Sequence, residues 1–513
     1  MRSTFAGLNT MVSGLNANQI ALDTVGHNIT NANNDGYSRQ RANASATKPE
    51  TIYTYYGASQ LGTGTSVESI TRARDEFADR QYWKENANLS QYEAEQYVLG
   101  KVETVFEEPS DTGFQTVLNK FWKTFETLGT NGSDYSARVQ VRDAGKELVN
   151  SITLARDQLN DLVTDNNTSI SKDVDSINQI TDEIFDLNKQ IITIEGSGSG
   201  NANDLRDRRD LLVDQLSEIV NVNVTENSYG AYNITCGSMS LVNGTADKTT
   251  LQTKTTTDPN YGFDIVTITD STTPTPVDLN PTSGEVKGIY DARDEVIGYL
   301  DKLTTMTAFL LNDFNDVHKA GFDLNNNAGI NFFGSDTATI DYTTLAYNSG
   351  TGTWEYGGGT AVTAVTNKDI LDELKVNSKF DDNSGTDLIA AKSATKSATT
   401  EGEASGTNAV LLGEWLHKKE STTTGGATLD DYYTGFTGEL GTSKTAVDRN
   451  VENLTTVKTQ ITSWRESVSG VNWDEELTNM LRFQKGYSSS ARVLTTMDEM
   501  LDKLINGTGV VGR

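Results

Sequence analysis

Apolar residues at both ends of the chain recur at the spacing of a coiled-coil seam. Near the start they fall on a repeat of seven, in which Gln19 and Gly26 fill two positions. A second repeat runs from Met480 to Ile505. Each pattern predicts a helix with one apolar face that another helix has to cover. The residues expected on these faces are Leu8, Val12, Leu15, Leu22 and Ile29, and, at the other end, Leu477, Leu481, Leu494, Met497, Leu501 and Ile505.

The first helix is predicted over about 3–31 and is followed by a turn. Residues 31–36 read Asn-Ala-Asn-Asn-Asp-Gly, in which Asn and Asp favour turns and Gly36 permits a positive φ. Residues 37–41 then read as a strand, and 42–70 as extended or hairpin structure. We include Asn33, Gly36 and Tyr37 in the expected assembly surface, together with the two apolar faces.

Small and polar residues interrupt both terminal repeats. Gln19, Gly26, Gln484 and Gly486 occupy positions where an ordinary core helix would have Leu or Ile. Such a helix buries little apolar area to offset its ordering entropy. We therefore expect the ends to fold against neighbouring subunits. The alternative is that they are ordinary core helices of a self-contained bundle.

The longest predicted element covers about 135–194, which contains no proline. Its apolar residues keep a near-heptad spacing, and sixty helical residues would form a rod of about 90 Å. A break at Asn166-Asn167-Thr168, which would give a helical hairpin, is the alternative. A shorter helix follows the glycine-rich link 196–200, with Arg206, Arg208 and Arg209 expected on its outer side.

The period changes from helical to alternating in two later stretches, which predicts β-rich inserts between helical segments. The fold class is therefore α+β: a long-helix bundle built from both chain ends, with β-rich inserted domains. The expected divisions are a terminal helix with its hairpin (1–70), long helices (71–220), a β-rich insert (221–284), a returning helix (285–320), a second polar β-rich insert (321–405), further helices (406–472) and a closing terminal helix (473–513).

Composition narrows the function classes. The net charge is −29, and the sequence has no cluster of Lys and Arg residues of the kind that contacts phosphates, which argues against nucleic-acid binding. Cys236 is the single cysteine, so no intrachain disulfide can form, and with three scattered histidines a zinc site is implausible. No stretch approaches the roughly 20 apolar residues that span a bilayer, and the start lacks the apolar core of a cleavable signal. We expect no membrane insertion.

No catalytic constellation emerges. Histidine, the usual general base, is scarce, and paired acids such as Asp430-Asp431 read as solvated charges at a helix start. Residues 323–329 resemble a calcium loop, yet Ala328 stands where the tight turn needs glycine, so an Asx-rich turn is favoured. We expect no enzyme activity, no cofactor and no metal. The alternatives are an enzyme carried in 330–405, which has no His or Cys, and a coiled-coil adhesin.

Several longer stretches resemble one known family. Residues 31–40, Asn-Ala-Asn-Asn-Asp-Gly-Tyr-Ser-Arg-Gln, resemble the signature after the first helix of bacterial flagellar axial proteins, and 469–501 resemble their C-terminal signature. Asn34 and Trp473 depart from the usual Thr and Leu. Residues 203–212 and 314–323 are similar to the hook-associated branch of this family, which forms the hook–filament junction. A hook or rod subunit is the alternative.

This resemblance implies a structural subunit. Like subunits would form a junction zone with the terminal helices lining the inner tube, the long helices outside them and the β inserts outermost. The implied partners are the hook protein, a second hook-associated junction protein on the filament side, and a cytoplasmic export chaperone on the C-terminal helix. It also implies an extracellular location, reached through the flagellar type III export apparatus without cleavage of a signal peptide.

Overall fold

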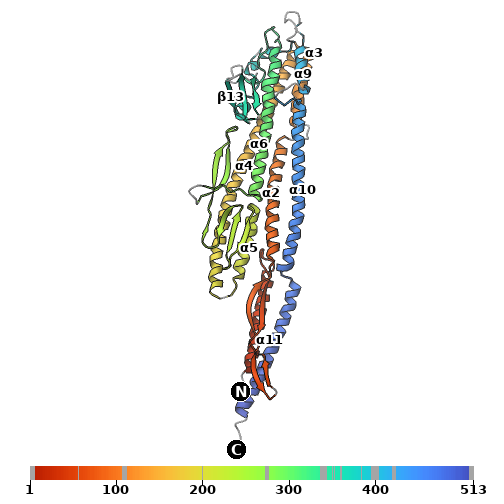
Figure 1. Cartoon of the computed structure of the whole chain (residues 1–513). Helices are drawn as coiled ribbons and strands as arrows, with labels where there is room; N and C mark the ends of the chain where they lie inside the picture. Colours follow the sequence, from red (N-terminus) through yellow and green to blue (C-terminus); the bar gives the residue numbers. More distant parts are fainter. Residues whose placement is uncertain are drawn as a thin grey trace, which may run out of the picture.

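The chain forms an elongated molecule in which two long helical regions lie end to end (Figure 1). The computed structural model describes residues 6–507, apart from 56, 107–112, 199, 272–275, 336–343, 349, 352, 359–360, 383, 394–401, 403 and 419–422. Both chain ends lie at the same tip of the molecule, and the other helices and the inserts form a thicker body beyond them (Figure 1). The predicted α+β class is confirmed.

The narrow end of the molecule contains the two terminal helices. Helix α1 (Ala6–Asn31) and helix α11 (Trp473–Asp502) pack together, and α11 continues into a π-helical turn, Lys503–Gly507. Two antiparallel strand pairs accompany them, both drawn from the segment between α1 and the body. These strands are β1 (Gln40–Ala46) with β4 (Thr65–Arg72), and β2 (Glu50–Thr54) with β3 (Gly57–Leu61).

Four long helices form the axis of the body. They are α2 (Glu76–Phe106), α4 (Tyr135–Gly196), α6 (Glu285–Phe309) and α10 (Leu429–Ser469). Shorter helices pack around them: α3 (Phe114–Thr130), α5 (Asn203–Ile219), α7 (Asn315–Ala320), α8 (Asn367–Glu373) and α9 (Thr407–Glu414), with a π-helical turn at Leu310–Phe314 between α6 and α7.

Helix α4 is continuous over 62 residues, so the hairpin alternative is wrong. The reason lies in the asparagines where the break was considered. Asn167 uses both ends of its amide on a neighbouring strand, donating to the carbonyl of Asp264 at 2.5 Å and accepting from the N–H of Val266 at 3.0 Å. The side chain therefore satisfies another backbone and leaves that of the helix undisturbed.

The inserts contain small antiparallel sheets. Strands β5 (Asn223–Glu226), β6 (Tyr232–Cys236), β7 (Met239–Asn243) and β8 (Asp247–Lys248) form one sheet in that order. Strands β9 (Leu251–Thr257) and β10 (Asp264–Asp270) form a pair, and β11 (Ala346–Asn348), β12 (Thr353–Gly358) and β13 (Ala361–Val365) form a third sheet. All three project from one side of the long helices (Figure 1).

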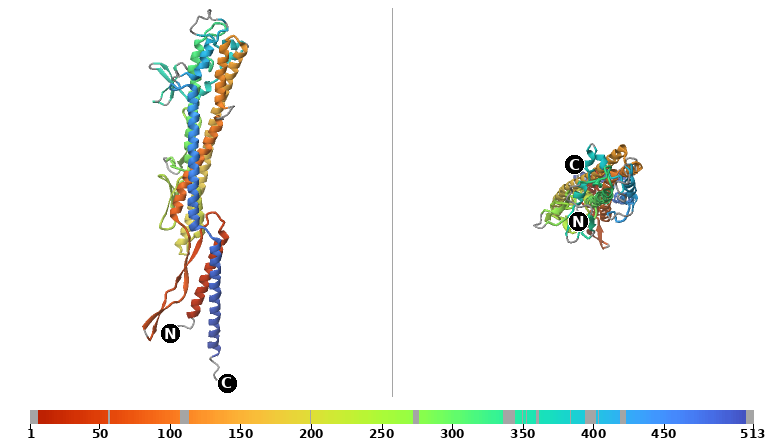
Figure 2. Two further views of the ribbon diagram at one scale, coloured as in Figure 1. Left: turned by 90° about the vertical axis from the view of Figure 1, so that its right-hand side faces the viewer. Right: turned by 90° about the horizontal axis from the view of Figure 1, so that it is seen from above.

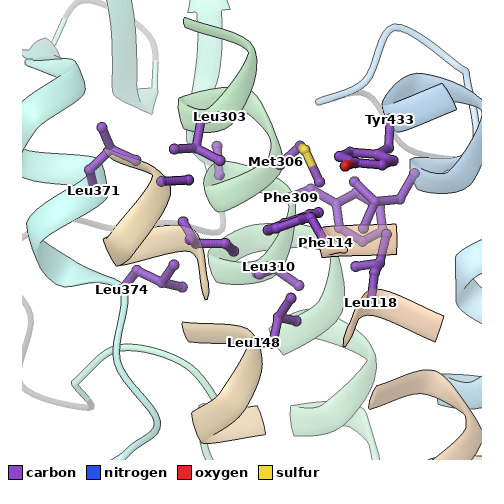
Figure 3. Close-up of a cluster of buried hydrophobic side chains, with 14 of the residues drawn as sticks. Phe114, Leu118, Leu148, Leu303, Met306, Phe309, Leu310, Leu371, Leu374 and Tyr433 are labelled. Carbon is purple, nitrogen blue, oxygen red and sulfur yellow. The ribbon is translucent and has the colours of Figure 1, made fainter. Parts of the chain in front are cut away.

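The body has two apolar clusters that follow one another along α4. The far cluster brings together α3, α4, α6 and α10, and Figure 3 shows Phe114, Leu148, Met306 and Tyr433 converging there from those four helices. The second cluster, near the narrow end, packs α4 and α5 on the first insert sheet, with Cys236 buried in it. Burial raises the pKa of the Cys236 thiol to about 12.

The structure tests two predictions about single residues, Asp323 and Arg209. The side chain of Asp323 accepts hydrogen bonds from the N–H and the side-chain amide of Asn327, at 2.7 and 3.0 Å, which is the Asx-rich turn favoured over a calcium loop. The expectation that Arg209 lies outside is wrong: it is fully buried, stacks 3.4 Å above the ring of Tyr232 and donates to Asn188 and Gly230. No helix in the described part of the chain is long and apolar enough to cross a membrane.

Asp173 lies on α4 next to Ile170 and Val174, which belong to the second apolar cluster. One of its carboxylate oxygens is buried and has no hydrogen-bond partner among the described residues, and burial, reinforced by Glu285, raises its pKa to about 7. Because the pKa in the unfolded chain is near 3.9, folding binds a proton between these values, and stability falls as the pH rises through about 7.

We expect Asp173→Asn to stabilise the subunit by about 1–3 kcal/mol at pH 8 and by much less at pH 4, since the amide needs no proton. Urea unfolding at both pH values measures this difference. Asp175→Asn, at an exposed position two residues away, serves as the control. An equal gain at both pH values would contradict the proposed ionisation.

Candidate functional site

Helices α1 and α11 pack antiparallel in one constant register. Between one facing pair and the next, the residue number on α11 falls by as many positions as the number on α1 rises. The seam is close because glycines line it: a Cβ added to Gly486 would lie 2.5 Å from the side-chain oxygen of Asn18. The facing pairs are Gly7 and Met497, Gly14 and Ser490, Asn18 and Gly486, and Asn28 and Glu476.

The apolar face predicted on α1 is not the face that meets α11. The contact series Gly7, Gly14 and Asn28 precedes the predicted series Leu8, Leu15 and Ile29 by one residue, which is 100° around a helix. The predicted residues therefore flank the seam: Leu8, Leu15, Leu22 and Ile29 are partly buried, and Val12 is 39% exposed.

The predicted residues of α11 divide between two sides of the helix. Leu494, Met497 and Leu501 are partly buried on the side of α1. Leu477 and Leu481 are 46% and 60% exposed, and Ile505, just beyond α11, is 66% exposed. Within one chain, the terminal pair, meaning α1 and α11, thus leaves large apolar side chains uncovered on both helices.

The charge of the chain is distributed very unevenly. Residues 1–72 and 473–513 together contain ten Lys or Arg and ten Asp or Glu, so the whole formal charge of −29 resides on 73–472. Copies of the terminal region can therefore approach one another without net repulsion, whereas the acidic bodies repel at short range.

Asn28 forms a buried network of hydrogen bonds at the end of the terminal pair that lies nearest the body. This residue is 1% exposed, and its amide nitrogen donates to the carbonyl of Gln40 at 2.9 Å and to Glu476 at 3.2 Å. Its amide oxygen accepts from the hydroxyl of Tyr37 at 2.8 Å and from the N–H of Gln40 at 2.9 Å. One buried amide therefore ties α1, the turn after it and α11 together.

The turn after α1 is held from two sides. Gly36 has a φ of +76° and packs against Leu211 of α5, so a left-handed conformation and a close approach both favour glycine, as predicted. Arg39 pairs with Glu475 at 2.9 Å and with Glu476 at 2.6 Å. The hydrogen bond from Arg39 holds the pKa of Glu475 below its usual range.

Tyr37 and Asn33, the remaining residues predicted in the turn, lie beside a polar cleft. The cleft has a volume of about 690 Å³ and lies between residues 32–39 and the connection from α10 to α11. Burial, followed by the carboxylates of Asp207 and Asp204, raises the pKa of Tyr37, so its hydroxyl stays protonated and donates to Asn28. Asn33 itself is exposed.

A cluster of buried charges joins the terminal pair to the body. On α5, Asp207, Asp210 and Asp214 lie on one face of the helix, and all three are largely buried. Arginines from three separate segments meet them. We call these residues the joint cluster: Arg72, Arg74, Asp79, Asp207, Asp210, Asp214 and Arg465.

The contacts of the joint cluster form a continuous chain. Arg72 binds Asp207 and Asp210, each at 2.7 Å. Arg74 binds Asp79 at 2.7 Å and Asp210 at 3.2 Å. Arg465 binds Asp79 and Asp214, each at 2.9 Å, and thereby connects α10 with α2 and α5. Each carboxylate therefore has at least one guanidinium partner, which buried charges require.

The pKa shifts show, for each aspartate, whether burial or the neighbouring arginines have the larger effect. Burial alone would raise the pKa of Asp210, but Arg74 and Arg72 outweigh it and hold that pKa below its ordinary value. For Asp207 and Asp214 burial prevails and the pKa is raised, although Arg72 and Arg465 oppose the shift. Asp210, bound by two arginines, is the carboxylate that the cluster stabilises most as an anion.

The family described as "Flagellar hook-associated protein FlgK helical domain" matches residues 99–333. "Flagella basal body rod protein" matches 8–37, and "Flagellar basal body rod FlgEFG protein C-terminal" matches 466–507. "Flagellar hook-associated protein 1" of Bacillus subtilis is 30% identical over the full length of both chains. The chain belongs to the flagellar hook-associated protein 1 family.

Further relatives agree with this membership. The flagellar hook-associated protein 1 of Escherichia coli is 28% identical, covering 97% of this chain and 99% of its own. The solved structure of the flagellar hook junction protein FlgK from Burkholderia pseudomallei shares the fold, with a TM-score of 0.61 at 18% identity, over 76% of this chain and all of the other. The chain is thus a structural component of the bacterial flagellum.

Replacing Asp210 tests the joint cluster. Asp210→Asn keeps the shape of the side chain but leaves Arg72 and Arg74 short of a buried counter-charge, and removing one member of such a pair costs about 3–5 kcal/mol. We expect the apparent free energy of unfolding in urea to fall by this amount. Asp35→Asn, at an exposed turn position, should change it by less than about 0.5 kcal/mol. Equal stability of the two variants would refute the assignment.

Proposed function

We propose that this chain is the subunit that joins the flagellar hook to the filament, and that it assembles through the outer faces of its terminal pair. The observation that carries the proposal is the uncovered apolar surface at that pair, in a molecule whose body buries two apolar clusters. We propose that the predicted residues on these outer faces contact neighbouring subunits: Leu8, Val12, Leu15, Leu22, Ile29, Leu477, Leu481 and Ile505. The other predicted residues support this surface from within the chain, Leu494, Met497 and Leu501 on the side of α1 and Asn33, Gly36 and Tyr37 in the turn after it. The proposal also includes the domain divisions that were predicted from the sequence.

The proposed partners follow from the position of a junction. Like subunits surround the axis as a ring, the hook protein lies on one side, and a second hook-associated junction protein lies on the filament side. A hook or rod subunit is the second candidate, favoured by the rod-protein families matched at 8–37 and 466–507. The match over 99–333 to the hook-associated helical domain supports the junction.

Export is the second part of the proposal. The subunit reaches the cell exterior through the flagellar export apparatus without cleavage of a signal peptide, and a cytoplasmic chaperone covers the C-terminal helix beforehand. The exposure of Leu477, Leu481, Met500 and Leu504 supports a cover of this kind, because such a surface promotes aggregation. The proposal assigns the chain no catalytic role, since its family is structural.

Charged substitutions on the uncovered side of α11 test the proposal. Leu477→Asp with Leu481→Asp should leave the subunit folded, because both positions are exposed, but should prevent close packing with other subunits. We expect cells in which this variant replaces the natural protein to form hooks without attached filaments and to be non-motile. Electron microscopy and swimming assays measure both outcomes.

The matched control is Thr478→Asp, an exposed position in the same helical turn. Circular dichroism of the purified variants checks that each has folded. Normal filaments on cells carrying the Leu477→Asp, Leu481→Asp subunit would refute assembly through this face.

A further inference from the structure

A polar cavity lies where the two apolar clusters of the body meet. It has a volume of about 750 Å³ and is lined by residues of α2, α4, α5, α6 and α10. Val98 of the far cluster and Ile289 of the second cluster both line it. We call it the mid-body cavity. It leaves part of the boundary between the clusters without the close packing that is found inside each of them.

Asn166 interrupts the buried side of α4 beside the mid-body cavity. Its apolar neighbours on that side are Val163, in the far cluster, and Ile170, in the second. Asn166 lines the cavity and is 6% exposed, and its amide nitrogen has no hydrogen-bond partner among the described residues. A buried amide needs a partner, so we expect water rather than an apolar side chain beside it. The two clusters are therefore weakly joined along this side of α4.

Hydroxyl side chains weaken the backbone of α4 at the same level. Thr164, Thr168 and Ser171 each donate to the carbonyl four residues earlier, at 3.2, 3.1 and 3.0 Å. Such bonds compete with the N–H groups of the helix for these carbonyls and often accompany a bend. This is the stretch in which the sequence pattern allowed a break, and the structure keeps it helical.

Helix α10 has the same feature where it passes the cavity. Lys458 lines the cavity, and four threonines around it donate to carbonyls four residues earlier: Thr455, Thr456, Thr459 and Thr462. Figure 2 shows α10, the upper blue helix, running along the body beside the other long helices. Among the described residues, neither apolar cluster includes any part of α10 after Val451. Two helices therefore have weakened backbones next to the cavity.

The β9–β10 hairpin connects the two halves of the body, each built around one cluster. Leu251 and Ile268, at its base, belong to the second cluster, whereas Tyr261, at its tip, belongs to the far cluster. The Tyr261 hydroxyl donates to Asp301 of α6 at 2.6 Å and accepts from the amide of Asn367 of α8 at 2.9 Å. The hairpin is therefore a brace between the halves, and Tyr261 fixes its tip.

We propose that the body bends at the mid-body cavity and that the β9–β10 hairpin limits the bend. The two clusters keep their packing, while residues 160–172 of α4 and 455–462 of α10 change their curvature. With its tip fixed at Tyr261 the hairpin holds the halves in line, and with its tip released it lets them turn. This is a property of the single subunit, so it holds or fails independently of the proposed junction function.

Hydrogen exchange in the purified full-length subunit tests the bend. Amides of 160–172 should exchange about tenfold faster than those of 141–159 and 174–191, because local opening is easiest where apolar contacts are few. They should still exchange more slowly than those of α1 and α11. Asn166→Leu, which lets an apolar side chain join the clusters, should remove the difference. Tyr261→Phe, which frees the hairpin tip, should increase it by about tenfold more.

The control for the brace is Tyr290→Phe. The Tyr290 hydroxyl accepts from the N–H of Ile268 at 3.1 Å, at the base of the same hairpin and within the second half, so its loss should leave exchange over 160–172 unchanged. Equal exchange over 160–172 and its flanking segments in the natural subunit would overturn the bend, as would an Asn166→Leu subunit that exchanges no more slowly. An effect of Tyr290→Phe equal to that of Tyr261→Phe would overturn the brace.

Spin labels on the two weakened helices measure the movement itself. Asp161→Cys on α4 and Gln460→Cys on α10 place the labels at exposed positions. Buried Cys236 stays unlabelled, since burial raises the pKa of its thiol to about 12. The distribution of distances between the labels should widen with Tyr261→Phe and narrow with Asn166→Leu. A distribution that neither substitution changes would contradict the proposal.

A label pair within one half is the matched control. Asp175→Cys and Ile194→Cys are both exposed positions of α4 beyond the cavity. Their distance distribution should stay narrow and unchanged in both variants. If it widens with Tyr261→Phe as much as the pair across the cavity, the movement is not confined to the mid-body cavity and the proposal fails.

Discussion

The buried charges between α5 and the arginines of the joint cluster are the constraint on which the rest of the structure depends. Asp207, Asp210 and Asp214 receive Arg72, Arg74 and Arg465, which come from the strand after the hairpin, the connection to α2 and the end of α10. These segments all lead into or out of the terminal pair. Because buried ions tolerate few geometries, the cluster holds that pair in line with the body.

The close contact between α1 and α11 explains how these helices can pack together and still leave apolar surface exposed. Gly7, Gly14 and Gly486 let the helices approach closely, but they bury little apolar area. The larger apolar residues then lie on the flanks of α1 and on the outer side of α11, where further subunits can reach them. Stability within one chain comes instead from Asn28, Glu476 and Arg39 at the end nearest the body.

Sequence patterns predicted the long elements well, because periodicity over many residues averages out exceptions. The continuous α4, both terminal helices and the positive φ of Gly36 agree with expectation. The joint cluster was missed, although the spacing of its three aspartates on α5 was visible, since their partners at 72, 74 and 465 are distant in sequence. The one-residue shift of the seam was missed because periodicity marks large apolar side chains, whereas close contact selects small ones.

Amide hydrogen exchange in free and assembled subunits tests most directly the claim that the terminal pair is completed by other subunits. In the free subunit we predict fast exchange across α1 and α11 and slow exchange across α4, whose apolar side is buried. In assembled flagella, α1 and α11 should become as protected as α4. Terminal helices that are already as protected as α4 in the free subunit would contradict the account.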